Sequence, residues 1–233
     1  MNKILKTAMV VAAIALPLQI RATVLTFDYP GAVNGTPIPQ TYGDNVAALD
    51  PQYGSGGGLT PNITVSYAAY QNNDLTGLVG TDAFWSTGYG DLTGVSYGNP
   101  NGYYASFTLT PAAGYSVTLE SFDFAGYLPN AGGYPGQSGV NELVRIFDGA
   151  ALVYDVSPTL FPFVGHDSLT PMITSANSIT ILFGADWNGA IDNIQFSQPG
   201  QTPTTPGVPD GGLTLALLGM SITGLGLMRR KLS

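Results

Sequence analysis

The chain has 233 residues, 44% of them hydrophobic and 11% aromatic, with 31 glycines, 17 prolines and no cysteine. The chain has fifteen acidic residues and only seven Lys and Arg residues. Arg145 is the one Lys or Arg between positions 22 and 228. The lack of cysteine excludes disulfides and thiolate metal sites, and the lack of clustered cations argues against nucleic-acid binding. Divalent cations are the more natural partners of such an acidic chain.

The N-terminus has the pattern of a secretory signal peptide. Lys3 and Lys6 precede an apolar stretch at 8–18, and Ala22 supplies a small residue for cleavage. The sequence therefore predicts a signal helix within residues 1–22, processing by signal peptidase, and an exported protein.

Residues 23–197 are predicted to form one all-β domain, a β-sandwich or jelly roll. Short runs of β-branched and aromatic residues alternate with polar ones, and turn residues separate them. The expected strands are 24–27, 63–67, 103–110, 117–125, 143–147, 151–156, 178–183 and 190–197. Asp148-Gly149 between two such runs predicts a hairpin, and the Gly/Pro-rich stretch 28–61 predicts a surface excursion. Eight or more short strands without helices between them favour two packed sheets.

The C-terminus combines a linker, a short motif, an apolar run and a basic end. Residues 198–207 are rich in Pro and Thr and predict an extended linker. The motif that follows is Val208, Pro209, Asp210, Gly211 and Gly212. Residues 213–228 would span about 24 Å as a helix, short of the roughly 30 Å hydrocarbon core, so we expect a marginal transmembrane helix. The predicted membrane stop is Arg229, Arg230 and Lys231.

This ending resembles the PEP-CTERM family of bacterial sorting signals. In that family a Val-Pro-Glu-Pro-like motif precedes a short transmembrane helix and an Arg-rich tail, and residues 208–212 look like its Val-Pro-Asp variant. The resemblance implies that an exosortase-like membrane protease recognises the tail and releases or re-attaches the protein at the cell surface. A plain single-pass anchor would show the same apolar run and basic end.

The body resembles the all-β extracellular domains common in PEP-CTERM proteins through three short stretches, at 25–28, 114–123 and 190–196. Such domains look like the jelly-roll modules of carbohydrate-binding proteins. In such modules an acidic residue from the first strand and one from the last can hold a structural Ca²⁺ with loop carbonyls. Asp28 and Asp192 occupy the matching places, and Asp44 and Asn45 could contribute from the following loop. The alternative is that Asp28 and Asp192 accept hydrogen bonds from nearby backbone amides, as Asp commonly does in turns.

Two tryptophans are candidates for ligand binding. Trp85 and Trp187 both lie in turn-like contexts, and sugar rings stack on flat side chains while polar neighbours bind their hydroxyls. Other loop tyrosines are Tyr89, Tyr97, Tyr103 and Tyr127. The alternative is that these aromatic residues belong to the core or rim of a sandwich.

Catalytic motifs are scarce, and we predict that the protein is not an enzyme. His166, Asp167 and Ser168 are adjacent in sequence, which does not make a triad whose members must converge in space. A glycosidase would need only two carboxylates, so a glycoside-active enzyme stays open as an alternative, with Glu120 and Glu142 as the two glutamates.

The sequence thus predicts an exported cell-surface or matrix protein with a structural or adhesive role, associated with extracellular polysaccharide. A carbohydrate-binding surface module is the alternative, because it needs the same export signals and the same fold.

Overall fold

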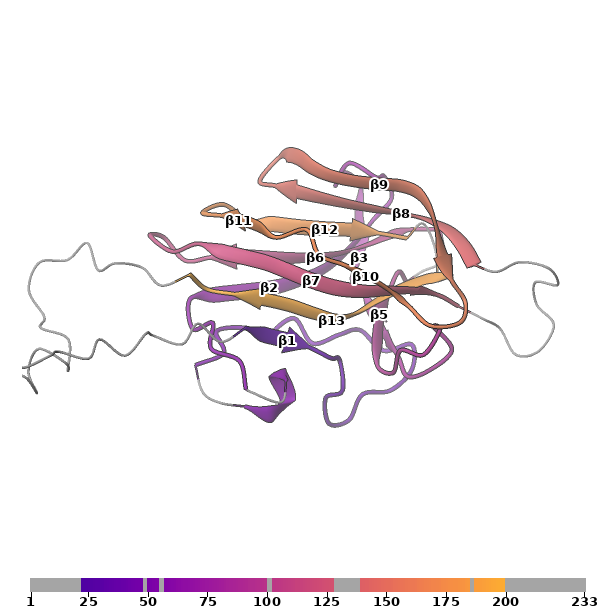
Figure 1. Cartoon of the computed structure of the whole chain (residues 1–233), viewed down its shortest axis with the longest axis horizontal. Helices are drawn as coiled ribbons and strands as arrows, with labels where there is room; N and C mark the ends of the chain where they lie inside the picture. The colour runs from indigo at the N-terminus through magenta and orange to yellow at the C-terminus, as the bar shows by residue number, and fades with distance from the viewer. Residues whose placement is uncertain are drawn as a thin grey trace, which may run out of the picture. The chain divides into compact units, whose positions relative to one another are not determined.

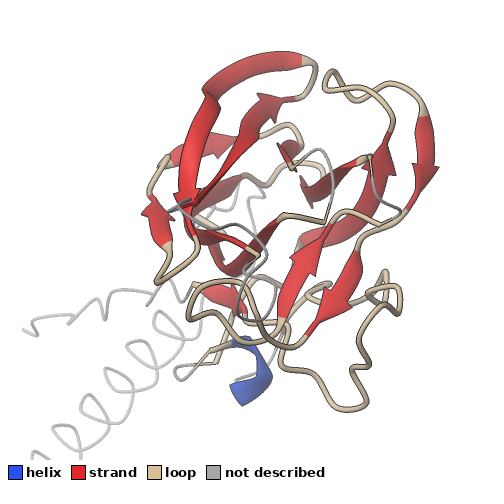
Figure 2. Ribbon diagram, turned by 90° about the vertical axis from the view of Figure 1, so that its right-hand side faces the viewer, coloured by secondary structure: helices blue, strands red, loops and turns tan. Residues whose placement is uncertain are grey.

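The computed structural model describes residues 22–47, 50–54, 57–99, 102–127, 139–184 and 187–199, all within one compact unit, Ile20–Gly200. These residues form two antiparallel β-sheets and one 3-10 turn, η1 (Pro51–Tyr53) (Figures 1 and 2). No helix in this part of the chain is long and apolar enough to cross a bilayer. The predicted signal helix, sorting motif, transmembrane helix and basic stop lie outside the described residues.

The first sheet carries the residues on which the functional argument rests. Its strands are β1 (Thr23–Leu25), β4 (Ala83–Trp85), β5 (Val95–Tyr97), β7 (Val117–Gly126), β10 (Asp167–Leu169), β11 (Ile173–Ser175) and β13 (Gly189–Ser197). The order is β10-β7-β13-β5-β4, while β1 pairs with β13 and β11 pairs with β7. The first and last strands of the body are therefore neighbours, with Leu25 opposite Ile194.

The second sheet has the order β3-β2-β6-β12-β8-β9. Its strands are β2 (Ile63–Tyr70), β3 (Leu78–Gly80), β6 (Tyr104–Pro111), β8 (Gly139–Asp148), β9 (Ala151–Pro162) and β12 (Ile179–Phe183). β12 is buried along its whole length between β6 and β8. Its sequence, Ile-Thr-Ile-Leu-Phe, therefore lacks the alternation of apolar and polar residues that a strand with one exposed face shows. β2 instead alternates between buried and more exposed residues because only one of its faces meets the core.

The core lies between the two sheets and is rich in phenylalanine. Six fully buried phenylalanine rings come from strands of both sheets: Phe107, Phe122, Phe124, Phe161, Phe183 and Phe196. Each buried ring contributes roughly 1.5–3 kcal/mol relative to an exposed one. Pairs of rings contact each other across the core, for example Phe107 and Phe196 with centroids 6.4 Å apart.

All eight predicted strands are present, and the all-β prediction is confirmed. Asp148-Gly149 closes the predicted hairpin, with Asp148 paired to Ala151 and Gly149 at φ 57°. The five strands that we did not predict are three residues long, too short to show a period of two. The stretch 28–61 is mostly irregular as predicted, but a pure surface excursion is wrong, because Ile38 and Tyr42 pack into the core.

One buried carboxyl group connects the two sheets. Asp82 is fully buried just before β4, and its carboxyl group contacts the Ser96 hydroxyl of β5 at 3.0 Å and accepts the Ser106 N–H of β6 at 3.2 Å. Desolvation raises the pKa of Asp82 well above its usual range, although the bonds to Ser96 and Ser106 lower it. The folded protein therefore binds a proton on the Asp82 carboxyl group more tightly than the unfolded chain does.

Candidate functional site

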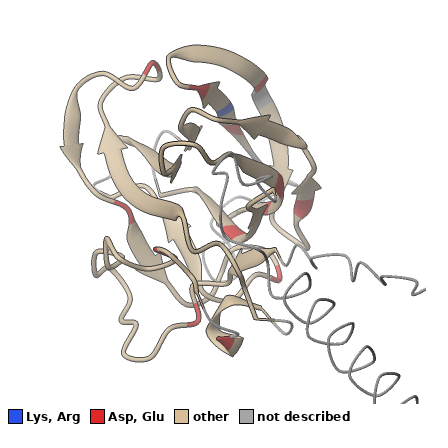
Figure 3. Cartoon of the chain, turned by 90° about the vertical axis from the view of Figure 1, so that its left-hand side faces the viewer, with Lys and Arg blue, Asp and Glu red and all other residues tan. Residues whose placement is uncertain are grey.

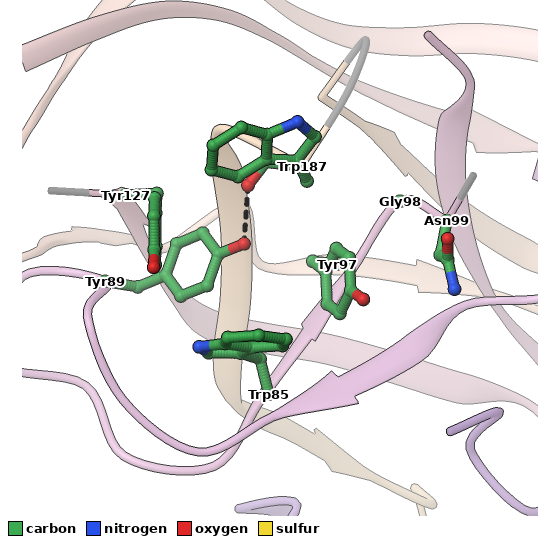
Figure 4. A pocket seen from close by; sticks show the side chains of 7 residues that line it. All are labelled: Trp85, Tyr89, Tyr97, Gly98, Asn99, Tyr127 and Trp187. Atoms are coloured by element: carbon green, nitrogen blue, oxygen red, sulfur yellow. Dashed lines mark hydrogen bonds between the residues drawn. The ribbon is translucent and has the colours of Figure 1, made fainter. Parts of the chain in front are cut away.

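An aromatic pocket lies at one end of the first sheet, with a cavity volume of about 220 Å³ (Figure 4). Seven of the described residues line it: Trp85, Tyr89, Tyr97, Gly98, Asn99, Tyr127 and Trp187. They come from β4 and the loop after it, from the end of β5 and the loop after it, from the residue after β7, and from the turn before β13. The antiparallel order of these strands brings the segments together.

Small residues on the sheet surface make room for the rings. Ala83, Ala125 and Ala190 are fully buried beneath this aromatic cluster, and the register places Ala190 opposite both Ala125 and Tyr97. Because side chains alternate across a strand, residues two apart share a face. Trp85 therefore lies on the same face as Ala83, away from the core side occupied by Phe84.

The rings meet at steep angles. Trp85 is nearly perpendicular to Tyr97 and to Tyr127, at 88° and 89°, with centroids 6.1 and 6.5 Å apart. Tyr127 and Trp187 are 5.1 Å apart at 69°. Figure 4 shows these four rings around the pocket, with the ring of Tyr89 among them. Tyr89 is 2% exposed and Trp85 is only partly buried, so the pocket has a closed inner end and an open rim.

Two features fix the position of these rings. The Tyr89 hydroxyl donates a hydrogen bond of 2.5 Å to the backbone carbonyl of Trp187. Gly88, at φ 101°, faces the ring of Tyr127 so closely that a Cβ at this position would lie 2.7 Å from a ring carbon. Only glycine adopts this conformation without strain and leaves the space that the Tyr127 ring occupies.

The sequence singled out both tryptophans, and the structure places Trp85 and Trp187 in the same pocket. Of the loop tyrosines noted with them, Tyr89, Tyr97 and Tyr127 also line it, whereas Tyr103 does not. Asn99 was missed, and no motif around it could have revealed it, because only the pairing of β5 with β13 brings its loop to the pocket.

A second, polar pocket of about 160 Å³ lies where the first and last strands of the body meet. Its lining residues are Thr26, Asp28, Asp91, Leu92, Thr93, His166, Asp192 and Asn193. The structure thus brings Asp28 and Asp192 to one pocket, as the sequence predicted. Phe27 and Asn193, beside the two carboxylates, have positive φ values of 54° and 49°, an unusual conformation for residues other than glycine.

The acidic side chains of this pocket lie close enough to affect one another's ionisation. Asp192 is 3% exposed, and desolvation raises its pKa to about 9, with smaller contributions from the negative charges of Asp28 and Asp123. One Asp192 carboxylate oxygen accepts the Asn193 N–H at 2.6 Å. Gly94 faces Asp28 so closely that a Cβ would lie 2.6 Å from its carboxylate oxygen. An oxygen-rich, acidic pocket of this kind fits Ca²⁺ held by carboxylates and neutral oxygens.

Two further residues of the predicted metal set do not line this pocket. Asp44 accepts the backbone N–H of Val65 at 2.5 Å, and Asn45 donates its own N–H to the carbonyl of Ile63 at 2.8 Å. Both therefore anchor the start of β2. Within the described residues no three His, Asp or Glu side chains form a ready-made metal site.

His166 is held by aspartates rather than by its sequence neighbours. Its Nδ1 lies 2.8 Å from Asp91 and its Nε2 lies 3.7 Å from Asp123. The hydrogen bond to Asp91 raises the pKa of His166 and lowers that of Asp91. Ser168 donates to Asp123 at 2.6 Å, so the His166-Asp167-Ser168 segment forms no His–Ser hydrogen bond among the contacts described.

Acidic residues are spread over the described chain, and basic ones are nearly absent (Figure 3). Arg145 on β8 is paired with Asp155 on β9 at 3.1 Å and also donates to the backbone carbonyl of Asn73. Among the described residues, no Lys or Arg lines either pocket.

Residues 207–232 match the model of the VPDSG-CTERM motif. The chain carries a PEP-CTERM-like sorting motif. The match confirms the sequence interpretation of this segment, and the motif implies an exported, cell-surface protein.

No curated protein sequence matches the chain. Among solved structures, the crystal structure of the Podospora anserina GH26-CBM35 β-(1,4)-mannanase is similar at 15% sequence identity and a TM-score of 0.32. The match covers 64% of this chain and 30% of the mannanase chain. A likeness this distant says nothing about ligand or activity.

Proposed function

We propose that this is an exported cell-surface protein whose β-sandwich binds carbohydrate of the extracellular matrix in the aromatic pocket, without hydrolysing it. The supporting observation is that Trp85 and Trp187, 102 positions apart in the sequence, line the same pocket. Their partly exposed rings offer apolar faces to the C–H groups of a sugar, while Asn99 and the tyrosine hydroxyls offer hydrogen bonds.

The size of the pocket suits one sugar residue. About 220 Å³ is smaller than the roughly 300–1,000 Å³ of pockets for drug-sized ligands. A polysaccharide would therefore place a single residue or a chain end in the pocket, and the rest of the chain would run over the rim. Repeated weak contacts of this kind suit a structural or adhesive protein, because many copies on one surface act together.

Retention on a panel of insoluble polysaccharides tests this proposal. We expect Trp85→Ala and Trp187→Ala each to weaken retention at least about tenfold, as loss of a central aromatic anchor does in other interfaces. Trp85→Phe keeps an aromatic face and should retain most binding. Tyr115→Ala, which changes a tyrosine outside the pocket, is the matched control. Equal retention of the parent and both alanine variants, with unchanged melting temperatures, would refute carbohydrate binding at this site.

We propose that Ca²⁺ binds in the polar pocket and supports the fold that holds the aromatic pocket. Asp28 and Asp192 would be the charged ligands, with the Thr26 and Asn193 side chains nearby. Binding of Ca²⁺ would compensate the desolvation that raises the pKa of Asp192, because a cation stabilises the ionised carboxylates. No step of sugar binding requires the ion itself.

Thermal unfolding with and without Ca²⁺ tests this site. At a Ca²⁺ concentration 100 times its dissociation constant, binding stabilises the fold by about 2.7 kcal/mol, and the melting temperature rises by several degrees. Asp192→Asn should remove this response, whereas Asp155→Asn, outside the pocket, should keep it. An identical melting temperature of the parent in EDTA and in Ca²⁺ would rule the site out.

We further propose that a membrane sorting enzyme of the exosortase kind cleaves the tail after transient anchoring. The linker at 198–207 would present the motif at 208–212 to that enzyme, and the apolar run at 213–228 would hold the chain in the membrane until cleavage.

A further inference from the structure

We infer that the aromatic pocket is also a cage for a quaternary ammonium group, the trimethylammonium head of choline and its derivatives. This inference goes beyond carbohydrate binding, because it assigns a second chemical class to the same pocket and can hold or fail independently. It rests on the different orientations of the aromatic rings, the lack of charged side chains among the described lining residues, and the charge of the chain.

The ring geometry suits a cation. A cation–π contact places the cation over the ring face, within about 6 Å of the centroid. Trp85 is nearly perpendicular to two other walls of the pocket, Tyr97 at 6.1 Å and 88° and Tyr127 at 6.5 Å and 89°, so rings in different orientations surround the site. Trp187 adds a further wall next to Tyr127 (Figure 4).

The lining favours a quaternary ammonium over a primary one. Among the described residues that line the pocket there is no Asp, Glu, Lys, Arg or His, so they offer an –NH₃⁺ group no carboxylate partner for the hydrogen bonds to water that it would lose. A trimethylammonium group has no N–H bonds to satisfy, and its methyl groups pack against aromatic carbon. The aromatic lining thus supplies ring faces and apolar contacts, and a trimethylammonium group requires no hydrogen-bond acceptor.

The charge of the chain would attract such a ligand. Between residues 23 and 207 there are 14 acidic residues and one Arg, a formal charge near −13. Arg145 is already paired with Asp155, so no free Lys or Arg in the described residues opposes this field. A net negative field raises the local concentration of cations near the pocket.

Intrinsic fluorescence offers a direct assay, because the chain has two tryptophans and both line the pocket. Titration of the exported protein with choline should shift this fluorescence and saturate. The neutral compound 3,3-dimethylbutan-1-ol has the shape of choline without its charge and should bind at least about tenfold more weakly. Tyr97→Leu and Tyr127→Leu keep both tryptophans as reporters and should each weaken choline binding about tenfold. Tyr103→Leu, outside the pocket, is the matched control.

The source of the headgroup is tested in parallel. Soluble phosphocholine represents a glycan substituent, and vesicles of phosphatidylcholine, compared with phosphatidylglycerol vesicles, represent a lipid surface. Saturable binding in either arm that the Tyr127→Leu variant loses supports the cage. Absence of choline binding, or equal affinity for the neutral compound, would overturn it. If polysaccharide retention still depends on Trp85 in that case, the cage alone has failed; if choline binds and no polysaccharide does, carbohydrate binding has failed.

Discussion

Replacing Asp82 by Asn should change how the stability of the protein depends on pH. Asp82 is fully buried between the sheets and its pKa is raised well above 3.8 by desolvation. In the unfolded chain the same carboxyl group ionises near its ordinary value. Between those two pKa values the folded protein holds one more proton than the unfolded chain, so stability falls as the pH rises.

The size of the effect follows from linkage. One proton held only in the folded state changes the free energy of unfolding by about 1.4 kcal/mol per pH unit. For a domain of this size that corresponds to roughly 3–5 °C in melting temperature per unit. Asp82→Asn removes this contribution, because the amide stays neutral and can still bond to Ser96 and Ser106. The variant should be more stable than the parent at pH 7.

Thermal unfolding in EDTA from pH 4.5 to 7.5 measures this difference, and comparing the two proteins cancels the titration of other groups. Asp74→Asn is the control. Hydrogen bonds to Thr76 lower the pKa of this exposed carboxylate, so its titration lies below the range tested. Parallel curves for the parent and Asp82→Asn would refute the reasoning, as would a lower melting temperature of Asp82→Asn at pH 7.

Two further predictions concern the aromatic pocket and the tail. Gly88→Ala should displace the Tyr127 ring and weaken ligand binding at least about tenfold, because a Cβ would meet that ring at 2.7 Å. Gly102→Ala has a similarly positive φ of 89° but open space around it, so it should lower stability by about 1 kcal/mol and leave binding unchanged; equal binding by both variants would contradict the steric argument. Deleting residues 208–233 should move the protein from the cell envelope to the medium, as measured by fractionation and immunoblotting, and unchanged fractionation would count against the sorting role.

Part of the candidate site could be predicted from the sequence. Trp85 and Trp187 stood out because each is a tryptophan in a turn-like context. Asp28 and Asp192 stood out because the resemblance to jelly-roll modules implies a metal site between the first and last strands. Asn99 could not be predicted, since it contributes through a loop with no motif. Asp82 also lay in a segment without a clear pattern, and only its position between β5 and β6 makes it unusual.

The sequence by itself determined the all-β class, eight of the strands, the hairpin at Asp148-Gly149 and the C-terminal sorting motif. Each of these features depends on residues that are close together in the sequence: on local periodicity, on turn residues or on a contiguous motif. The tertiary structure alone decided that Trp85, Tyr97, Tyr127 and Trp187 surround one pocket. That outcome depends on the strand order β7-β13-β5-β4 and on alanines beneath the rings, and pairing between distant strands leaves no mark in any short stretch of sequence.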